Sequence, residues 1–109
     1  METMERTVVE AINAGKVAAA QAASTFLTAH GAGPCGFAWC TAEVKGSTKM
    51  GRMLLKNGFA KAYGGGLQIW NPSDNMTQSI DAKEQGAYAF ALVMREKLGI
   101  NISMGSRMD

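Results

Sequence analysis

The most concentrated positive charge in the chain lies between Glu43 and Asp74, a segment that contains no acidic residue. Within it Lys49, Arg52 and Lys56 are spaced three and four residues apart, so on a helix they form one stripe. Such a stripe can attract phosphate groups or an acidic partner, and it can equally be the solvated face of an amphipathic helix. The three cations are therefore candidate phosphate contacts.

Aromatic residues form the second candidate group. Residues 34–44 are predicted to form a strand with small side chains on one face and rings on the other. The small residues are Gly36, Ala38, Cys40 and Ala42, and the rings are Phe37 and Trp39. Rings on an open sheet can stack nucleic-acid bases, although the N-terminal helix or a second subunit can cover such a face instead. The predicted stacking residues are Trp39, Tyr63 and Trp70, with Asn71 and Arg107 orienting the ligand.

Catalytic, metal-binding and cofactor motifs are weak in this sequence. Cys35 has a potential base in His30, the single histidine, but lone thiols pack more often than they react. The chain has no zinc-ligand spacing. The GxGxxG match at residues 31–36 does not follow a strand and open a helix, as a dinucleotide site requires. We therefore expect no catalytic residue, no metal and no cofactor.

The elements that position these residues can be predicted from periodicity and end signals. Helices are expected over residues 3–29, with a break near 13–15, over 48–57, and over 81–98, with Asp81 as the N-cap. Residues 59–63 and 67–70 should form a hairpin around three glycines, although the first arm can instead prolong the preceding helix. Residues 100–104 should form a last strand, followed by a polar end at 105–109.

From residue 35 onward the predicted order is β-α-β-β-α-β, preceded by a helix, which is typical of an α+β, ferredoxin-like fold. This fold has a four-stranded antiparallel sheet with two helices on one face. Gly86 in the last helix is expected to pack on the small face of the first strand. The alternative is a three-stranded α/β sheet. The 109 residues fit a single domain, with residues 1–30 as a helical extension and 34–109 as the core.

Composition and end sequences favour a compact protein of the cytoplasm. The chain is 47% hydrophobic and 18% charged, with a net charge of +2. Its longest apolar run is too short and too polar to span a membrane, and its N-terminus lacks the features of a signal peptide. No membrane partner is therefore expected.

Five short motifs resemble a group of small uncharacterised proteins encoded by tailed bacteriophages. They are CGFAW at 35–39, YGGG at 63–66, WNPS at 70–73, TQS at 77–79 and GSRMD at 105–109. The resemblance covers residues 34–109 and carries no activity or catalytic residues with it. It implies a soluble accessory protein in an infected bacterial cytoplasm, a setting in which such proteins often bind host factors, signalling nucleotides or nucleic acid.

The leading hypothesis is a non-enzymatic phage accessory protein, a homodimer, that binds a phosphate-bearing ligand such as nucleic acid or a nucleotide. The alternative is an interaction protein that binds a host protein without a small ligand. A third hypothesis is an enzyme that uses Cys35 as its nucleophile.

Overall fold

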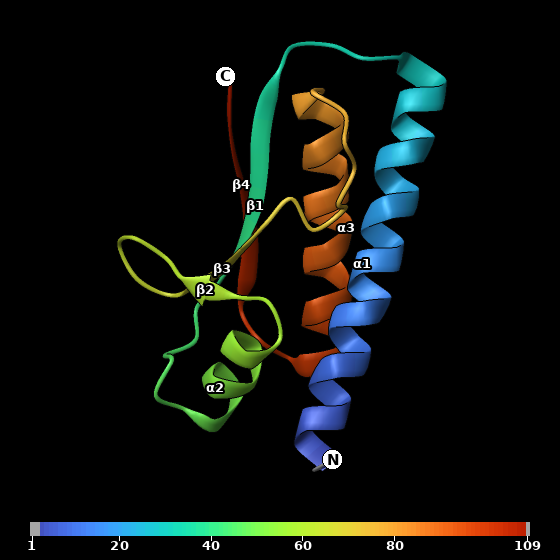
Figure 1. The fold of residues 1–109 in the computed structure, drawn as a ribbon. Helices are drawn as coiled ribbons and strands as arrows, with labels where there is room; N and C mark the ends of the chain where they lie inside the picture. The colour runs from blue at the N-terminus through green and yellow to red at the C-terminus, as the bar shows by residue number, and fades with distance from the viewer. Residues whose placement is uncertain (1–2, 109) are drawn as a thin grey trace.

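The computed structural model describes residues 3–108 and has an α+β fold (Figure 1). These residues contain three helices and a four-stranded sheet. The elements are α1 (Thr3–His30), β1 (Gly36–Ala42), α2 (Lys49–Lys56), β2 (Ala60–Lys61), β3 (Leu67–Trp70), α3 (Ile80–Leu98) and β4 (Ile102–Met108). No helix among the described residues combines the length and the apolar character needed to cross a membrane.

The sheet has the strand order β2-β3-β1-β4, and each neighbouring pair is antiparallel. This four-stranded sheet rules out the three-stranded alternative. Trp39 is paired with Trp70 and with Gly105, and Phe37 with Arg107. Residues paired across antiparallel strands share a face, so these side chains gather on one side of the sheet. The small residues of β1 are buried on the other side, which confirms the predicted two faces of this strand.

The helices form two layers on the buried side of the sheet. Helix α3 stands between the sheet and α1 (Figure 1). The thiol of Cys40 in β1 donates a hydrogen bond to the carbonyl of Ala87 in α3 at 3.0 Å. The prediction that Gly86 would meet β1 is wrong, because Gly86 faces α1: a Cβ there would lie 3.1 Å from the Ala19 oxygen and 2.7 Å from the Cβ of Ser73.

Helix α1 is continuous, so the predicted break near residues 13–15 is wrong. Gly15 allows the Phe90 ring of α3 to pack directly against the α1 backbone, since a Cβ on Gly15 would lie 2.8 Å from that ring. Val8, Ala11, Ile12 and Ala19 of α1 belong to the hydrophobic core. The N-terminal helix is thus packed into the body of the protein.

Other predicted boundaries vary in accuracy. Helix α2 and strand β3 lie where they were expected, with Thr48 capping α2. Gly99 ends α3 in a left-handed conformation with φ of 64°. The N-cap of α3 is Ser79 rather than Asp81, because the Ser79 hydroxyl accepts the capping hydrogen bond from the Ala82 amide. Strand β2 is limited to two residues, and β4 continues to Met108 through the segment predicted to be a polar end.

Replacing Gly86 with Ala should destabilise the fold. Alanine gains roughly 1 kcal/mol over glycine in a helix interior, but overpacking costs about 1–3 kcal/mol, and a main-chain oxygen cannot swing aside. We expect Gly86→Ala to lower the free energy of unfolding, as measured by urea denaturation. The exposed neighbour Gln85 provides the control, and Gln85→Ala should change stability by less than about 0.5 kcal/mol. Stabilisation by Gly86→Ala would contradict the packing described for α1 and α3.

Candidate functional site

The candidate site is the sheet face opposite the helices, called here the ring face. Its aromatic side chains are Phe37, Trp39 and Trp70. The Trp39 and Trp70 rings are 4.9 Å apart at an angle of 40°, and the Phe37 and Trp70 rings meet edge to face at 6.3 Å. Trp70 remains 48% exposed and Phe37 36% exposed. The rings therefore pack together while leaving aromatic surface open to solvent.

No helix of the described chain covers these rings. Helix α3 lies on the opposite face of the sheet, and α1 packs on α3 and α2. The possibility that the N-terminal helix lies across the rings is therefore excluded for residues 3–30.

The position of Trp39 depends on a glycine in the neighbouring strand. A Cβ on Gly105 would lie 2.8 Å from the Trp39 indole, so the indole rests directly on the backbone of β4. In addition, two cations flank Phe37: the Lys83 ammonium is 5.2 Å from the ring centre and the Arg107 guanidinium 5.8 Å. The buried Lys83 also donates to the Gly36 carbonyl at 2.9 Å. Sequence reasoning did not single out Lys83, because it lies within a run of helix residues and its partner is far away in the chain.

A hollow of about 330 Å³ lies at one end of the ring face. It is bounded by the two tryptophans, by Arg107, and by Tyr63 with the turn of three glycines at residues 64–66, called here the glycine turn. The full lining is Trp39, Thr41, Ala62, Tyr63, Gly64, Gly65, Gln68, Trp70 and Arg107. The structure thus brings together four of the eight predicted ligand-binding residues.

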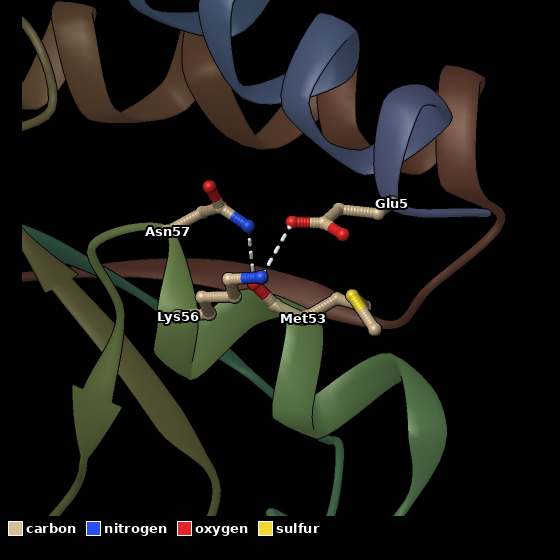
Figure 2. Close-up of polar contacts among 4 residues, drawn as sticks. All are labelled: Glu5, Met53, Lys56 and Asn57. Atoms are coloured by element: carbon tan, nitrogen blue, oxygen red, sulfur yellow. Dashed lines mark hydrogen bonds and ion pairs between the residues drawn. The ribbon is translucent and has the colours of Figure 1, made fainter. Parts of the chain in front are cut away.

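The three predicted cations of α2 are not part of this hollow. Lys56 forms an ion pair with Glu5 of α1 at 2.9 Å (Figure 2), and Arg52 donates to the Ser47 carbonyl at 2.6 Å. Lys49 lies on the same helix. Figure 2 shows Lys56 directed toward α1, beside the bond from the Asn57 amide to the Met53 carbonyl. Lys56 and Arg52 of this stripe therefore already contact other groups of the protein.

Asn71 has a structural role in the loop after β3. Its backbone has a positive φ of 43°. Its side chain donates to the Asn75 carbonyl at 3.1 Å and accepts from the Ser73 hydroxyl at 2.9 Å. These bonds hold the 71–75 loop in place, next to Trp70.

Comparison of the chain with protein-family models, with curated proteins and with solved structures finds no match.

A second hollow of about 540 Å³ lies on the other side of the glycine turn. Its lining includes Lys45, Lys61 and Glu43, and it shares Ala62 and Gly65 with the first hollow. Lys61 is paired with Leu67, whose side chain is buried on the helix side of the sheet. Both lysines belong to the acid-free segment of the sequence, and the fold places them beside the glycine turn.

The two cysteines differ in environment. Cys40 is buried, and loss of hydration raises the pKa of its thiol to about 12, while the charge of Arg95 acts in the opposite direction. Cys35 is exposed, and it pairs through its backbone with Ser79. The ring centres of His30 and Phe26 are 4.7 Å apart. Among the described residues, 3–108, no hydrogen bond joins His30 to Cys35. In the same part of the chain, no three His, Cys, Asp or Glu side chains are grouped to hold a metal ion.

Gly105→Ala should displace the Trp39 indole from β4. The added methyl carbon would lie 2.8 Å from the Trp39 indole, which is too close for either group to keep its position. We therefore expect a loss of about 1–3 kcal/mol in the free energy of unfolding and a shift in tryptophan emission. Ser103→Ala, two residues away on the same strand and face, is the matched control and should leave the emission unchanged. An unchanged spectrum in Gly105→Ala would contradict this contact.

Cys40 should make stability depend on pH in alkaline solution. Its pKa rises from 9.0 in the unfolded chain to about 12 in the folded protein, so the unfolded chain loses the proton first as pH rises. The stabilising contribution is complete below pH 9 and falls between pH 9 and about 12. The stability advantage of wild type over Cys40→Ala, measured by urea denaturation, should shrink by up to about 1.4 kcal/mol per pH unit above pH 9. Cys35→Ala, which keeps Cys40, should follow wild type, and a constant difference between wild type and Cys40→Ala would contradict the prediction.

Proposed function

We propose that this protein is a non-enzymatic binding protein that holds single-stranded nucleic acid on the ring face. The observation that carries the proposal is the cluster of Phe37, Trp39 and Trp70, partly exposed and not covered by a helix of the described chain, with Arg107 beside it. Base stacking on such rings is tolerant of sequence because every base has a flat face. A cation beside the rings can pair with the phosphate of the nucleotide whose base is stacked.

The shape of the site favours a strand over a double helix. The rings lie on a sheet surface rather than on a protruding helix or ribbon, so they reach bases only where these are unpaired. Tyr63, on the exposed glycine turn, and Trp70 border the same hollow. A short single strand can therefore place one base in the hollow and the next on Trp70 or Phe37, and a nucleotide is the smallest ligand of this kind.

Phosphate contacts can come from three groups of cations. Arg107 lies on the ring face itself, and Lys45 and Lys61 line the hollow on the other side of the glycine turn. The stripe on α2 forms a third group, in which Lys56 is already paired with Glu5. We favour Arg107 as the principal contact because, of the two cations beside Phe37, Arg107 is exposed, whereas Lys83 is buried and bonds to the Gly36 carbonyl.

The ferredoxin-like class belongs to this proposal too. The order β-α-β-β-α-β from β1 to β4 supports it, as does the antiparallel pairing throughout the sheet. RNA-recognition modules stack bases on the open face of a four-stranded sheet, which agrees with the position of the rings. The resemblance to small phage proteins supports a role as an accessory factor in infected bacterial cells.

Trp70→Ala should weaken binding of a short oligothymidylate. Removing the stacking of one base costs about 1–3 kcal/mol, or roughly 5- to 150-fold in Kd, measured by fluorescence anisotropy of a labelled oligonucleotide. Tyr88→Ala, which removes an exposed ring on α3, is the control and should bind like wild type. Failure of wild type to bind any oligonucleotide or nucleotide at low salt would refute the proposed function.

A charge reversal at Arg107 should identify the residue that pairs with phosphate. Arg107→Glu should lower affinity and reduce the slope of log K against log salt by about 0.7 for each phosphate that the variant no longer neutralises. Arg52→Glu reverses a charge on α2 and tests the alternative location. Arg6→Glu reverses a charge at an exposed position on α1, away from both surfaces, and is the control. If Arg52→Glu reduces the slope and Arg107→Glu does not, the strand lies along α2 and not on the ring face.

A further inference from the structure

Strand β4 has an unpaired edge within residues 3–108. It is the last strand in the sheet order and pairs with β1 alone. The Glu43 amide donates to the Asn101 carbonyl at 2.7 Å. Because residues of an antiparallel strand bond alternately to one side and to the other, the odd-numbered residues of β4 bond to β1. The backbone groups of the even-numbered residues therefore point outward from the sheet. The Arg95 side chain donates to one outward carbonyl, that of Ile102, at 2.8 Å. The outward groups of Met104, Ser106 and Met108 remain available.

This edge has little of the usual protection against pairing, because Arg107 is the single charged residue of β4. Strand β4 contains no proline and no lysine, and it runs in unbroken register with β1 from Ile102 to Met108. Natural proteins generally block such an edge with lysine, proline or a bulge, or they cover it. A seven-residue strand without these features is suited to pairing with another strand.

An apolar flank of α3 lies beside the same edge. Glu84 accepts a hydrogen bond from the Ser106 hydroxyl, and Arg95 bonds to Ile102, so these residues mark the side of α3 that faces β4. Tyr88 and Leu92 lie between them on that stripe and are 52% and 43% exposed. The opposite flank of α3 is covered by α1, where Phe90 meets Gly15. The free edge and the uncovered flank thus form one continuous surface.

We propose that this surface binds a second copy of the chain, with the two β4 strands antiparallel around a two-fold axis at Gly105. This register places Met104 opposite Ser106 of the second copy. It also places Arg107, the single charged residue of β4, opposite Ser103, so no like charges meet.

Charge order on α3 identifies a second copy as the partner. Glu84 lies toward one end of the exposed stripe and Arg95 toward the other. A two-fold axis reverses one helix relative to its neighbour, so Glu84 of each copy is brought toward Arg95 of the other, with Tyr88 and Leu92 between them. The dimer joins the two sheets into one and places both ring faces on the same side. It does not require a ligand, so it stands independently of the proposed function.

Sedimentation velocity of the full chain at about 1 to 100 µM, without ligand, tests the dimer. We expect wild type to form a dimer and Leu92→Glu to be monomeric, because the charge would be buried against the second copy. Val17, an apolar residue of α1 that is 60% exposed, supplies the matched control, and Val17→Glu should remain dimeric. Circular dichroism would show that both variants are folded.

Amide hydrogen exchange gives a second measurement that does not depend on a mutation. Because the Met104 and Ser106 amides point outward from β4, they should become protected as protein concentration rises, while the exposed Tyr63 amide should not. A wild-type monomer across the concentration range would overturn the proposal. A dimer that resists Leu92→Glu but dissociates in Trp70→Glu would also overturn it, because the second copy would then lie on the ring face.

Discussion

The close approach of α3 to β1 is the constraint on which the rest of the structure depends. It requires small residues at each inward position of β1: a Cβ on Gly36 would lie 2.6 Å from the Ile80 side chain, and the Cys40 thiol reaches the Ala87 carbonyl at 3.0 Å. Because side chains alternate along a strand, this pattern leaves the outward positions for large residues. Phe37 and Trp39 occupy two of them, so the packing of one face creates the ring face on the other.

Sequence patterns predicted those features that depend on a few neighbouring residues. The two faces of β1 follow from simple alternation, and α2 from its cap at Thr48 and its stop at Asn57. The side of α3 that meets the sheet was not predictable in this way, because small residues lie on both sides: Ala87 faces β1 and Gly86 faces α1. Likewise, Gly15 reads as a helix breaker until its partner Phe90, far along the chain, is known.

The candidate site also combines features that the local sequence predicts with features that depend on distant parts of the chain. The rings could be predicted because they alternate with small residues. The pairing of Lys56 with Glu5 could not be, because a segment without acids in the sequence says nothing of an acid that α1 brings from the N-terminus. Nor does the sequence of β4 look like a strand beyond Met104. Its last residues join the sheet through backbone pairing with β1, and Gly105 is small because the Trp39 indole lies on it.

Strand β4 contributes to two surfaces through different chemical groups. Its odd-numbered residues bond to β1 through their backbone and turn their side chains, including Arg107, toward the ring face. Its even-numbered residues turn their backbone to the open edge and their side chains toward α3, where the Ser106 hydroxyl meets Glu84. The odd-numbered side chains of this strand therefore belong to the ring face, and its even-numbered backbone groups form the open edge of the sheet. Because the two sets of groups point in different directions, pairing along β4 would leave the ring face of each chain open.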